Sequence, residues 1–193
     1  MCGRYSLFVD EDIEELRAIV QEAEQRSRGA EMKTGEIFPT NPAPVLVRNG
    51  QKSAAEILNW GFPGFSGKGV IINARAETAE EKKMFRTSLM DRRCVIPSTG
   101  FYEWKHEETK TKQKYKFNLP GEPLLYMAGF WNEFEGERRF VILTTEPNES
   151  IADVHNRMPV VLTKDSIDQW ISDLGKAMEL LHAIPLLLVR DAV

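Results

Sequence analysis

Cys2 is the residue of this sequence with the most distinctive reactivity. Removal of the initiator methionine, which is usual when the next side chain is small, would leave Cys2 with a free α-amine beside its thiol. The amine has a reference pKa of about 7.7 to 8.0 and the thiol one of about 8.5, so both are partly in their reactive base forms near neutral pH. Such a 1,2-aminothiol attacks a carbonyl through nitrogen and closes through sulfur to a five-membered thiazolidine, or attacks an amide through sulfur alone. The alternative is a small buried cysteine, a common state of a free thiol.

Asn73 and Arg75 form a second candidate group. They follow a short apolar segment and precede an expected helix, so their side chains leave the edge of a sheet where backbone amides are free. At such a place an asparagine can orient a carbonyl or a hydroxyl, and an arginine can clamp a phosphate through two hydrogen bonds. The alternative is a turn asparagine with a surface arginine.

Glu103 is a candidate for general acid or base chemistry. It lies among three aromatic residues, Phe101, Tyr102 and Trp104. Aromatic surroundings raise the pKa of a carboxyl group and so bring it closer to neutral pH. A structural ion pair with a nearby lysine or arginine is an equally good explanation of this glutamate.

His155 lies in a polar loop before an apolar segment, between Asp153 and Arg157, either of which could orient it. Histidine is suited to proton transfer because its reference pKa is about 6.5, although an isolated loop histidine is more often structural or simply solvated. The sequence contains no zinc-ligand spacing, no phosphate-binding glycine loop and no serine nucleophile elbow. We therefore expect chemistry from protein side chains, without a cofactor or a metal.

Length and composition bound the class of protein. A chain of 193 residues with 42% hydrophobic side chains suits one domain, which we expect to span residues 1–193. Its two cysteines, Cys2 and Cys94, are far apart and offer no disulfide framework. No apolar run is long enough to cross a bilayer, and there is no signal-peptide core. We expect a cytoplasmic protein without a membrane partner.

The formal net charge of −4 is unevenly distributed. Residues 10–24 carry seven carboxylates and one arginine, a local charge of −6, which leaves +2 for the rest of the chain. The acidity is thus concentrated on one expected helix. A basic groove elsewhere, and with it a nucleic-acid partner, remains compatible with the acidic total.

The pattern of apolar residues predicts many short strands joined mainly by hairpins, with helices that do not alternate strictly with them. We expect strands over residues 4–9, 45–48, 53–60, 70–72, 93–97, 101–105, 114–119, 124–131, 138–145 and 158–163. We expect helices from Asp10 to near Gly29, from a capping box at Thr78 and Glu81, and over 165–182, and an irregular loop over the three prolines of 38–44. These elements predict an α+β fold, a mainly antiparallel sheet that forms an open barrel-like core with flanking helices.

Seven short blocks occur in the same order as in one known family. They are MCGRY at 1–5, WGF at 60–62, NARAET at 73–78, PSTGFYEW at 97–104, AGFW at 128–131, TT at 144–145 and HNRMP at 155–159. Each block alone is weakly specific. Together they resemble the SRAP (SOS response-associated peptidase) family over nearly the whole chain.

This resemblance implies a sensor of abasic sites in single-stranded DNA that acts in the DNA damage response. Its α+β open barrel would carry a positively charged groove. Cys2 would form a covalent thiazolidine crosslink with the ring-opened sugar aldehyde, and the Schiff-base intermediate would also allow a weak abasic-site lyase activity. We expect a monomer that associates with the nucleoid when it binds DNA.

The resemblance also assigns roles to individual residues. Asn73 would hold the sugar oxygen and the cysteine, Glu103 would assist ring opening and proton transfer, and His155 would act as acid or base in forming and reversing the crosslink. The residues expected to bind DNA or to shape its site are Arg4, Arg75, Lys83, Arg86, Trp60 and Trp104.

Two positions depart from the family pattern. Many members have an Arg-Tyr-Asn stretch where this chain has Thr-Gly-Glu at 34–36, so we expect one DNA contact to be lost or replaced. A tryptophan pair of some members is represented here only by Phe65. Lys83 and Arg86 are candidate substitutes, which would add salt-dependent affinity without sequence information.

Two other functions are compatible with the same sequence. Class II glutamine amidotransferases also begin Met-Cys-Gly, so one alternative is an N-terminal-cysteine amidohydrolase, or an autopeptidase that removes Met1. The other is a module that binds single-stranded or modified DNA through arginine and tryptophan without covalent chemistry.

Overall fold

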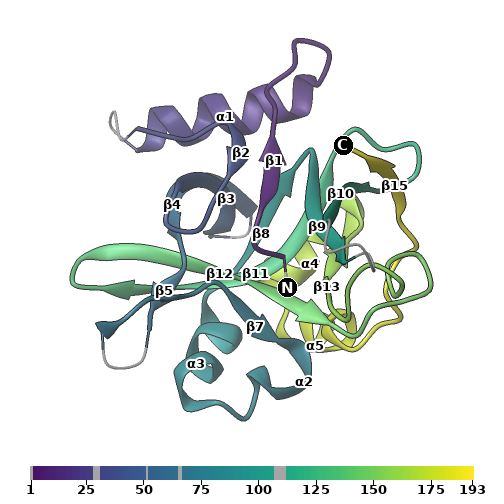
Figure 1. Ribbon diagram of the computed structural model, residues 1–193. Coiled ribbons are helices and arrows are strands. Elements are labelled where there is room, and N and C mark those ends of the chain that lie inside the picture. Colours follow the sequence, from purple (N-terminus) through teal and green to yellow (C-terminus); the bar gives the residue numbers. More distant parts are fainter. Residues whose placement is uncertain (1, 28–30, 51, 65–66, 107–111) are drawn as a thin grey trace.

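The computed structural model describes residues 2–27, 31–50, 52–64, 67–106 and 112–193. Within these ranges the strands form sheets of eight, five and two strands, and most helices lie at the periphery (Figure 1). The α+β fold, mainly antiparallel, is confirmed. The elements are β1 (Tyr5–Leu7), α1 (Glu14–Arg26), β2 (Gly35–Ile37), β3 (Pro42–Asn49), β4 (Lys52–Trp60), β5 (Phe62–Pro63), β6 (Val70–Ile71), β7 (Asn73–Arg75), α2 (Ala76–Ala79), α3 (Lys83–Asp91), β8 (Arg93–Ser98), β9 (Gly100–His106), β10 (Lys112–Asn118), β11 (Leu125–Phe134), β12 (Glu137–Thr145), β13 (Met158–Pro159), β14 (Val161–Leu162), the short 3-10 helix η2 (Lys164–Ser166), α4 (Ile167–Ser172), α5 (Leu174–Leu181) and β15 (Val189–Ala192).

Five strands of the largest sheet close on themselves. Their order is β12-β4-β3-β8-β11, and β11 pairs back with β12. Each of these pairs is antiparallel except β4 with β12, which is parallel. The five strands bury apolar side chains in one core, among them Val45, Leu58, Ile96, Ala128 and Ile142. The barrel-like core expected from the sequence is confirmed, and its ring of strands is closed.

The five-stranded sheet has the order β15-β10-β9-β1-β2 and is antiparallel throughout. Tyr5 pairs with Phe101, which pairs with Phe117, and all three side chains are fully buried. These residues define the inner face of the sheet. Alternate residues of a strand point to opposite faces, so Trp104 and its partner Lys114 lie on the outer face.

The helix α1 confirms the amphipathic helix predicted near the N-terminus. It begins at Glu14 instead of Asp10 because Asp10 forms a turn, in which its carboxylate accepts a hydrogen bond from the backbone of Asp12. The helix packs on β3 and β4. Its buried residues are Leu16, Ile19, Val20 and Ala23. None of the helices in the described ranges combines the length and the apolar character that crossing a bilayer requires.

The irregular loop predicted over residues 38–44 is confirmed only in its first half. Residues 38–41 form a turn, closed by a hydrogen bond from the backbone of Asn41 to that of Phe38, whereas the second half is a strand. β3 begins at Pro42 and includes Pro44. Here β3 pairs only with β4, since its pairing with β8 is confined to Leu46 and Val47. Proline is compatible with a strand where its missing N–H would face no neighbour. The ladder with β4 therefore outweighs the local preference for a loop.

Two helix predictions are wrong in their boundaries. Thr78 lies inside the short helix α2 and does not cap a helix, and α3 begins at Lys83. The single helix expected over 165–182 is divided at Asp173, whose carboxylate accepts a hydrogen bond from the backbone of Lys176 and starts α5. The strand β15 was not expected because its residues are exposed, and it is held by main-chain pairing with β10.

Candidate functional site

Cys2 and Asn73 are joined across 71 positions of the chain. Cys2 is fully buried, and its backbone oxygen accepts a hydrogen bond of 3.0 Å from Asn73 Nδ2. Asn73 is the first residue of β7, and the parallel pairing of β7 with β12 fixes its position. Asn73 Oδ1 is also buried and accepts no hydrogen bond within the described ranges. The Asn73 amide thus holds the backbone of Cys2 through its N–H group. Its oxygen can still accept a hydrogen bond from a hydroxyl group.

The thiol of Cys2 is neutral in this environment. Burial raises its pKa well above the usual range, and the charge of Glu103 raises it further. The sulfur lies 3.9 Å from the backbone oxygen of Arg4, which accepts the weak S–H hydrogen bond. Because the thiolate is the nucleophilic form, reaction at this sulfur requires a base nearby.

Glu103 is a buried carboxyl group on β9. It lies two residues after Phe101, so it shares the inner face of the sheet, and only 4% of its surface is exposed. Burial raises its pKa from 4.5 to about 7, the direction that its aromatic neighbours led us to expect. Near neutral pH such a group is divided between its acid and base forms. It can therefore both accept and return a proton.

His155 faces Glu103 from the loop that precedes β13. Its Nδ1 lies 3.0 Å from the backbone nitrogen and 3.2 Å from the backbone oxygen of Arg157, so both contacts hold the ring against this residue. Nε2 is 3.9 Å from Glu103 Oε2, and the contact becomes an ion pair when the ring is protonated. The loop thus brings an imidazole ring close to the buried carboxyl group.

Arg157 fixes the loop that carries His155. Its guanidinium donates to both carboxylate oxygens of Glu77, at 2.9 and 2.8 Å, and to the backbone oxygen of Thr144 at 2.6 Å. Asp153, the other residue considered from the sequence, pairs instead with cations on β9 and β15. The clamp between Arg157 and Glu77 was not foreseen. Its only signal in the sequence is that both residues lie in blocks that carry the family resemblance.

The residues expected to contact DNA lie in two places. Arg4 and Trp104 are neighbours on the outer face of the five-stranded sheet, with the Arg4 guanidinium carbon 4.9 Å from the centre of the Trp104 ring. Arg75, at the end of β7, and Lys83 and Arg86, on α3, are exposed. Their positions are compatible with phosphate contacts, which stay a prediction.

Trp60 is a core residue at the end of β4. It is fully buried, and the centre of its ring lies 5.2 Å from that of Tyr5 and 6.3 Å from that of Phe140. It therefore supports the strand that follows the N-terminal residues and offers no surface on which a base could stack in this conformation. Phe65 and Met1 lie outside the described residues.

By their chemistry, these side chains are suited to covalent catalysis that depends on proton transfer. Cys2 supplies a nucleophile, Asn73 can hold an oxygen, and Glu103 with His155 can move protons. In the part of the chain that the structure describes, no group of three or more His, Cys, Asp or Glu side chains could hold a metal ion.

Comparisons with known proteins identify the family. The family described as SOS response associated peptidase (SRAP) matches residues 1–187. The chain is 36% identical over 189 residues to the abasic site processing protein YoqW of Bacillus subtilis (strain 168), an alignment that covers 89% of this chain and 80% of that protein. It is 34% identical over 203 residues to the abasic site processing protein YoaM of the same strain, with 100% and 87% covered. A solved structure of a Bacteroides thetaiotaomicron protein has the same fold, with a TM-score of 0.78 at 23% identity over 100% of this chain and 92% of that one. The chain therefore belongs to the SOS response associated peptidase (SRAP) family.

Proposed function

We propose that this protein captures abasic sites in single-stranded DNA as a thiazolidine crosslink through Cys2, with a weak abasic-site lyase activity. The observation that carries the proposal is the buried Cys2, whose backbone is held by Asn73 and whose thiol lies in the electrostatic field of a carboxyl group, Glu103, with a pKa of about 7. The names of YoqW and YoaM, abasic site processing proteins, support the same substrate. The α-amine of Cys2 takes part only after Met1 has been removed.

The first step is the opening of the abasic sugar. The C1′ hydroxyl loses a proton, the bond between C1′ and O4′ breaks, and O4′ takes up a proton, which yields an aldehyde. Glu103 is suited to accept the first proton and return the second, because its pKa of about 7 leaves both of its forms populated. Asn73 Oδ1 would accept a hydrogen bond from a sugar hydroxyl.

The second step joins the protein to the aldehyde carbon. The α-amine of Cys2 attacks C1′ and the adduct loses water, which leaves a Schiff base. The sulfur then attacks the same carbon while its proton passes to the ring nitrogen, directly or through Glu103, and the thiazolidine closes. The net change is the loss of one water molecule. Because Cys2 is fully buried, bulk water has little access to the closed ring.

The lyase activity follows from the same intermediate. A Schiff base at C1′ makes the proton on C2′ acidic, and its removal by a base expels the 3′ phosphate and cuts the strand. Attack by the sulfur of Cys2 competes with this elimination. We therefore expect strand cleavage to be slow beside crosslinking, and to increase when the sulfur is removed but the amine is kept.

The test is intact-mass spectrometry before and after incubation with a single-stranded oligonucleotide that contains one abasic site. The expected product is a heat-stable adduct with the mass of the protein without Met1, plus the oligonucleotide, minus one water. The matched control substrate carries a tetrahydrofuran residue, which lacks the C1′ hydroxyl and cannot open to an aldehyde.

Three results would overturn the proposal in different ways. A protein that keeps Met1 and binds the oligonucleotide without an adduct would be a binding module. A protein that has lost Met1 but forms no adduct would use its cysteine for other chemistry, such as amide hydrolysis. An adduct with the tetrahydrofuran control would show that the aldehyde is not the group attacked.

A further inference from the structure

The outer face of the five-stranded sheet carries a group of side chains that the proposed chemistry does not use. This outer-face cluster consists of Arg4, Glu36, Phe38, Trp104 and Lys114. The residues come from β2, β9, β10 and the segments next to β1 and β2. Two cations, one carboxylate and two aromatic rings thus meet on the sheet whose inner face bears the buried glutamate of the reactive site.

Arg4 is held in place mainly by aromatic rings. The carbon at the centre of its guanidinium lies 4.2 Å from the centre of the Phe38 ring and 4.9 Å from that of Trp104. Contacts of this kind orient a planar guanidinium and leave hydrogen-bond donors at its rim. The position of Arg4 therefore does not depend on an acidic partner alone.

Glu36 forms ion pairs with both cations of the cluster, Arg4 and Lys114. Its Oε2 lies 3.2 Å from Arg4 Nη1, and its Oε1 accepts a hydrogen bond from Lys114 Nζ. The hydrogen bond and charge of Lys114, with the charge of Arg4, lower the pKa of Glu36. The carboxylate is thus ionised at neutral pH, and it remains 30% exposed.

We propose that Glu36 takes the place of a DNA phosphate in the free protein, and that a backbone phosphate of single-stranded DNA displaces it from Arg4 and Lys114. This inference rests on the proposed function, because it places the phosphate next to the reactive residue. Arg4 is two residues from Cys2, a separation of at most about 7 Å along an extended chain. A phosphate on Arg4 would therefore belong to a nucleotide close to the captured sugar.

The geometry of the cluster favours this exchange. Glu36 meets Arg4 through one nitrogen at 3.2 Å, whereas a phosphate can accept two parallel hydrogen bonds from a guanidinium. Trp104 is partly exposed, and 40% of Phe38 is exposed, so the cluster also offers rings on which neighbouring bases can stack. Glu36 belongs to the Thr-Gly-Glu stretch at 34–36, where many family members have Arg-Tyr-Asn. In this chain it would compete with DNA for the two cations and so lower the affinity for DNA.

The size of the effect follows from the two ion pairs that DNA must break. An exposed pair changes an equilibrium constant by about 1.4- to 5-fold, so two pairs correspond to about 2- to 30-fold. Glu36→Gln keeps the shape of the side chain and removes its charge. We expect the variant to bind single-stranded DNA about 2- to 30-fold more tightly. We also expect the slope of log K against log salt to steepen by about 0.7 for each additional phosphate that the variant neutralises.

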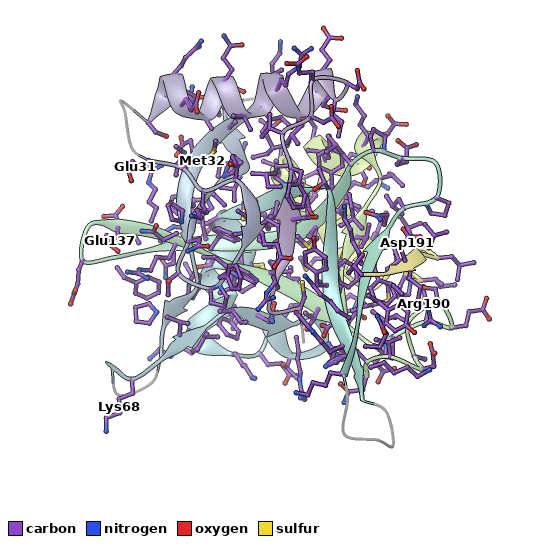
Figure 2. The ribbon with its side chains drawn as sticks, turned by 45° about the horizontal axis from the view of Figure 1, so that its top comes forward. Glu31, Met32, Lys68, Glu137, Arg190 and Asp191 are labelled. Atoms are coloured by element: carbon purple, nitrogen blue, oxygen red, sulfur yellow. The ribbon has the colours of Figure 1, made fainter. Side chains whose placement is uncertain are left out.

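The measurement is fluorescence anisotropy of a labelled single-stranded oligonucleotide without an abasic site, titrated over a series of salt concentrations. The matched control is Glu56→Gln, because Glu56 also bridges two cations, Arg26 and Arg138, at similar exposure. Figure 2 shows Glu137, the neighbour of Arg138, on the side of the molecule opposite to Arg190 of β15, the strand that pairs with β10. Glu56 lies on β4 of the eight-stranded sheet, whereas the strands of the cluster belong to the five-stranded sheet. The control therefore frees two arginines and removes one negative charge on a different sheet, and we expect it to leave affinity nearly unchanged.

A double-mutant cycle with Lys114→Gln tests whether the tighter binding comes from the released cations. We expect Lys114→Gln to weaken binding more in the Glu36→Gln background than in the native protein, because only there is the lysine free to meet a phosphate. Equal effects in the two backgrounds would overturn the inference. So would a Glu36→Gln variant that binds no more tightly than Glu56→Gln.

The same variants separate this inference from the proposed function. If the native protein crosslinks an abasic oligonucleotide but Glu36→Gln binds no more tightly, only the inference fails. If Glu36→Gln binds more tightly but no variant forms an adduct, only the covalent function fails. If neither the native protein nor Glu36→Gln binds single-stranded DNA, both the inference and the proposed function are wrong.

Discussion

Replacing Glu103 by glutamine should make the protein more stable at high pH. The same substitution should slow crosslinking. The pKa of this buried carboxyl is raised from 4.5 to about 7 because burial disfavours its charged form. Between pH 4.5 and about pH 7 the carboxyl group binds more protons in the folded state than in the unfolded state. Its contribution to the free energy of unfolding is therefore present at low pH and is lost as the pH rises through this range. At about 1.4 kcal/mol per pKa unit, the loss reaches about 3 kcal/mol above the folded-state pKa.

Glutamine keeps the shape of the side chain and cannot ionise, so Glu103→Gln should escape this loss. We expect it to exceed the native protein in free energy of unfolding by about 3 kcal/mol at about pH 8, and by only about 1 kcal/mol at about pH 5. For a chain of this length the difference at the higher pH corresponds to a rise in Tm of about 6 to 12 °C.

The assay is urea unfolding at both pH values, with Glu24→Gln as the matched control, because Glu24 is an exposed residue of α1. The control should change little and equally at both pH values. A stability difference for Glu103→Gln that does not grow between about pH 5 and about pH 8 would refute the reasoning. An unchanged crosslinking rate in a correctly folded Glu103→Gln protein would remove the carboxyl group from the mechanism.

Substitutions at four other positions test the site and its scaffold. Cys2→Ser should yield no heat-stable adduct in the mass assay, and a stable one would contradict closure through sulfur. Asn73→Ala should slow crosslinking at least about 10-fold in single-turnover kinetics while unmodified single-stranded DNA still binds, and an unchanged rate would exclude a positioning role. Arg157→Gln removes the two-point contact with Glu77, so it should slow crosslinking and shift its pH profile; Arg157→Lys should not restore the rate, because lysine cannot make two parallel hydrogen bonds. Gly129→Ala should lower the urea midpoint by the equivalent of about 1 to 3 kcal/mol at unchanged m-value, since its Cβ would lie closer than 3.0 Å to a backbone oxygen of β12.

The elements that could be predicted are those whose local pattern agrees with their tertiary role. The amphipathic period of α1 and the alternation of Tyr115 and Phe117 on β10 are signals of this kind. Pro42 and Pro44 carry the opposite local signal, and pairing with β4 overrides it. Similarly β15 has no apolar pattern, because this exposed edge strand is held by main-chain hydrogen bonds to β10 and by the ion pair of Arg190 with Asp153, not by burial of apolar side chains.

The candidate site could be predicted by residue type but not by geometry. Each of four residues suits a chemical role by its type, yet no local rule brings them together: Cys2, Asn73, Glu103 and His155. The structure does so through long-range pairing: β7 runs beside β12, and β1 lies beside β9. The hydrogen bond from Asn73 to the backbone of Cys2 depends on both. Periodicity and capping rules describe neighbours in sequence, so they carry no information about such contacts.

Register within one sheet decides which glutamate is buried and which binds cations. Glu103 and Glu36 lie on β9 and β2, the two neighbours of β1. Glu103 points to the inner face, where burial raises its pKa to about 7, whereas Glu36 lies on the outer face, where Lys114 lowers its pKa. A one-residue slip of β9 would move its side chains to opposite faces, bringing Trp104 inward and Glu103 toward the lysine. The buried carboxyl group would then become another surface counter-ion, so the pairing of β9 with β1 and β10 sets its pKa as much as the identity of the residue does.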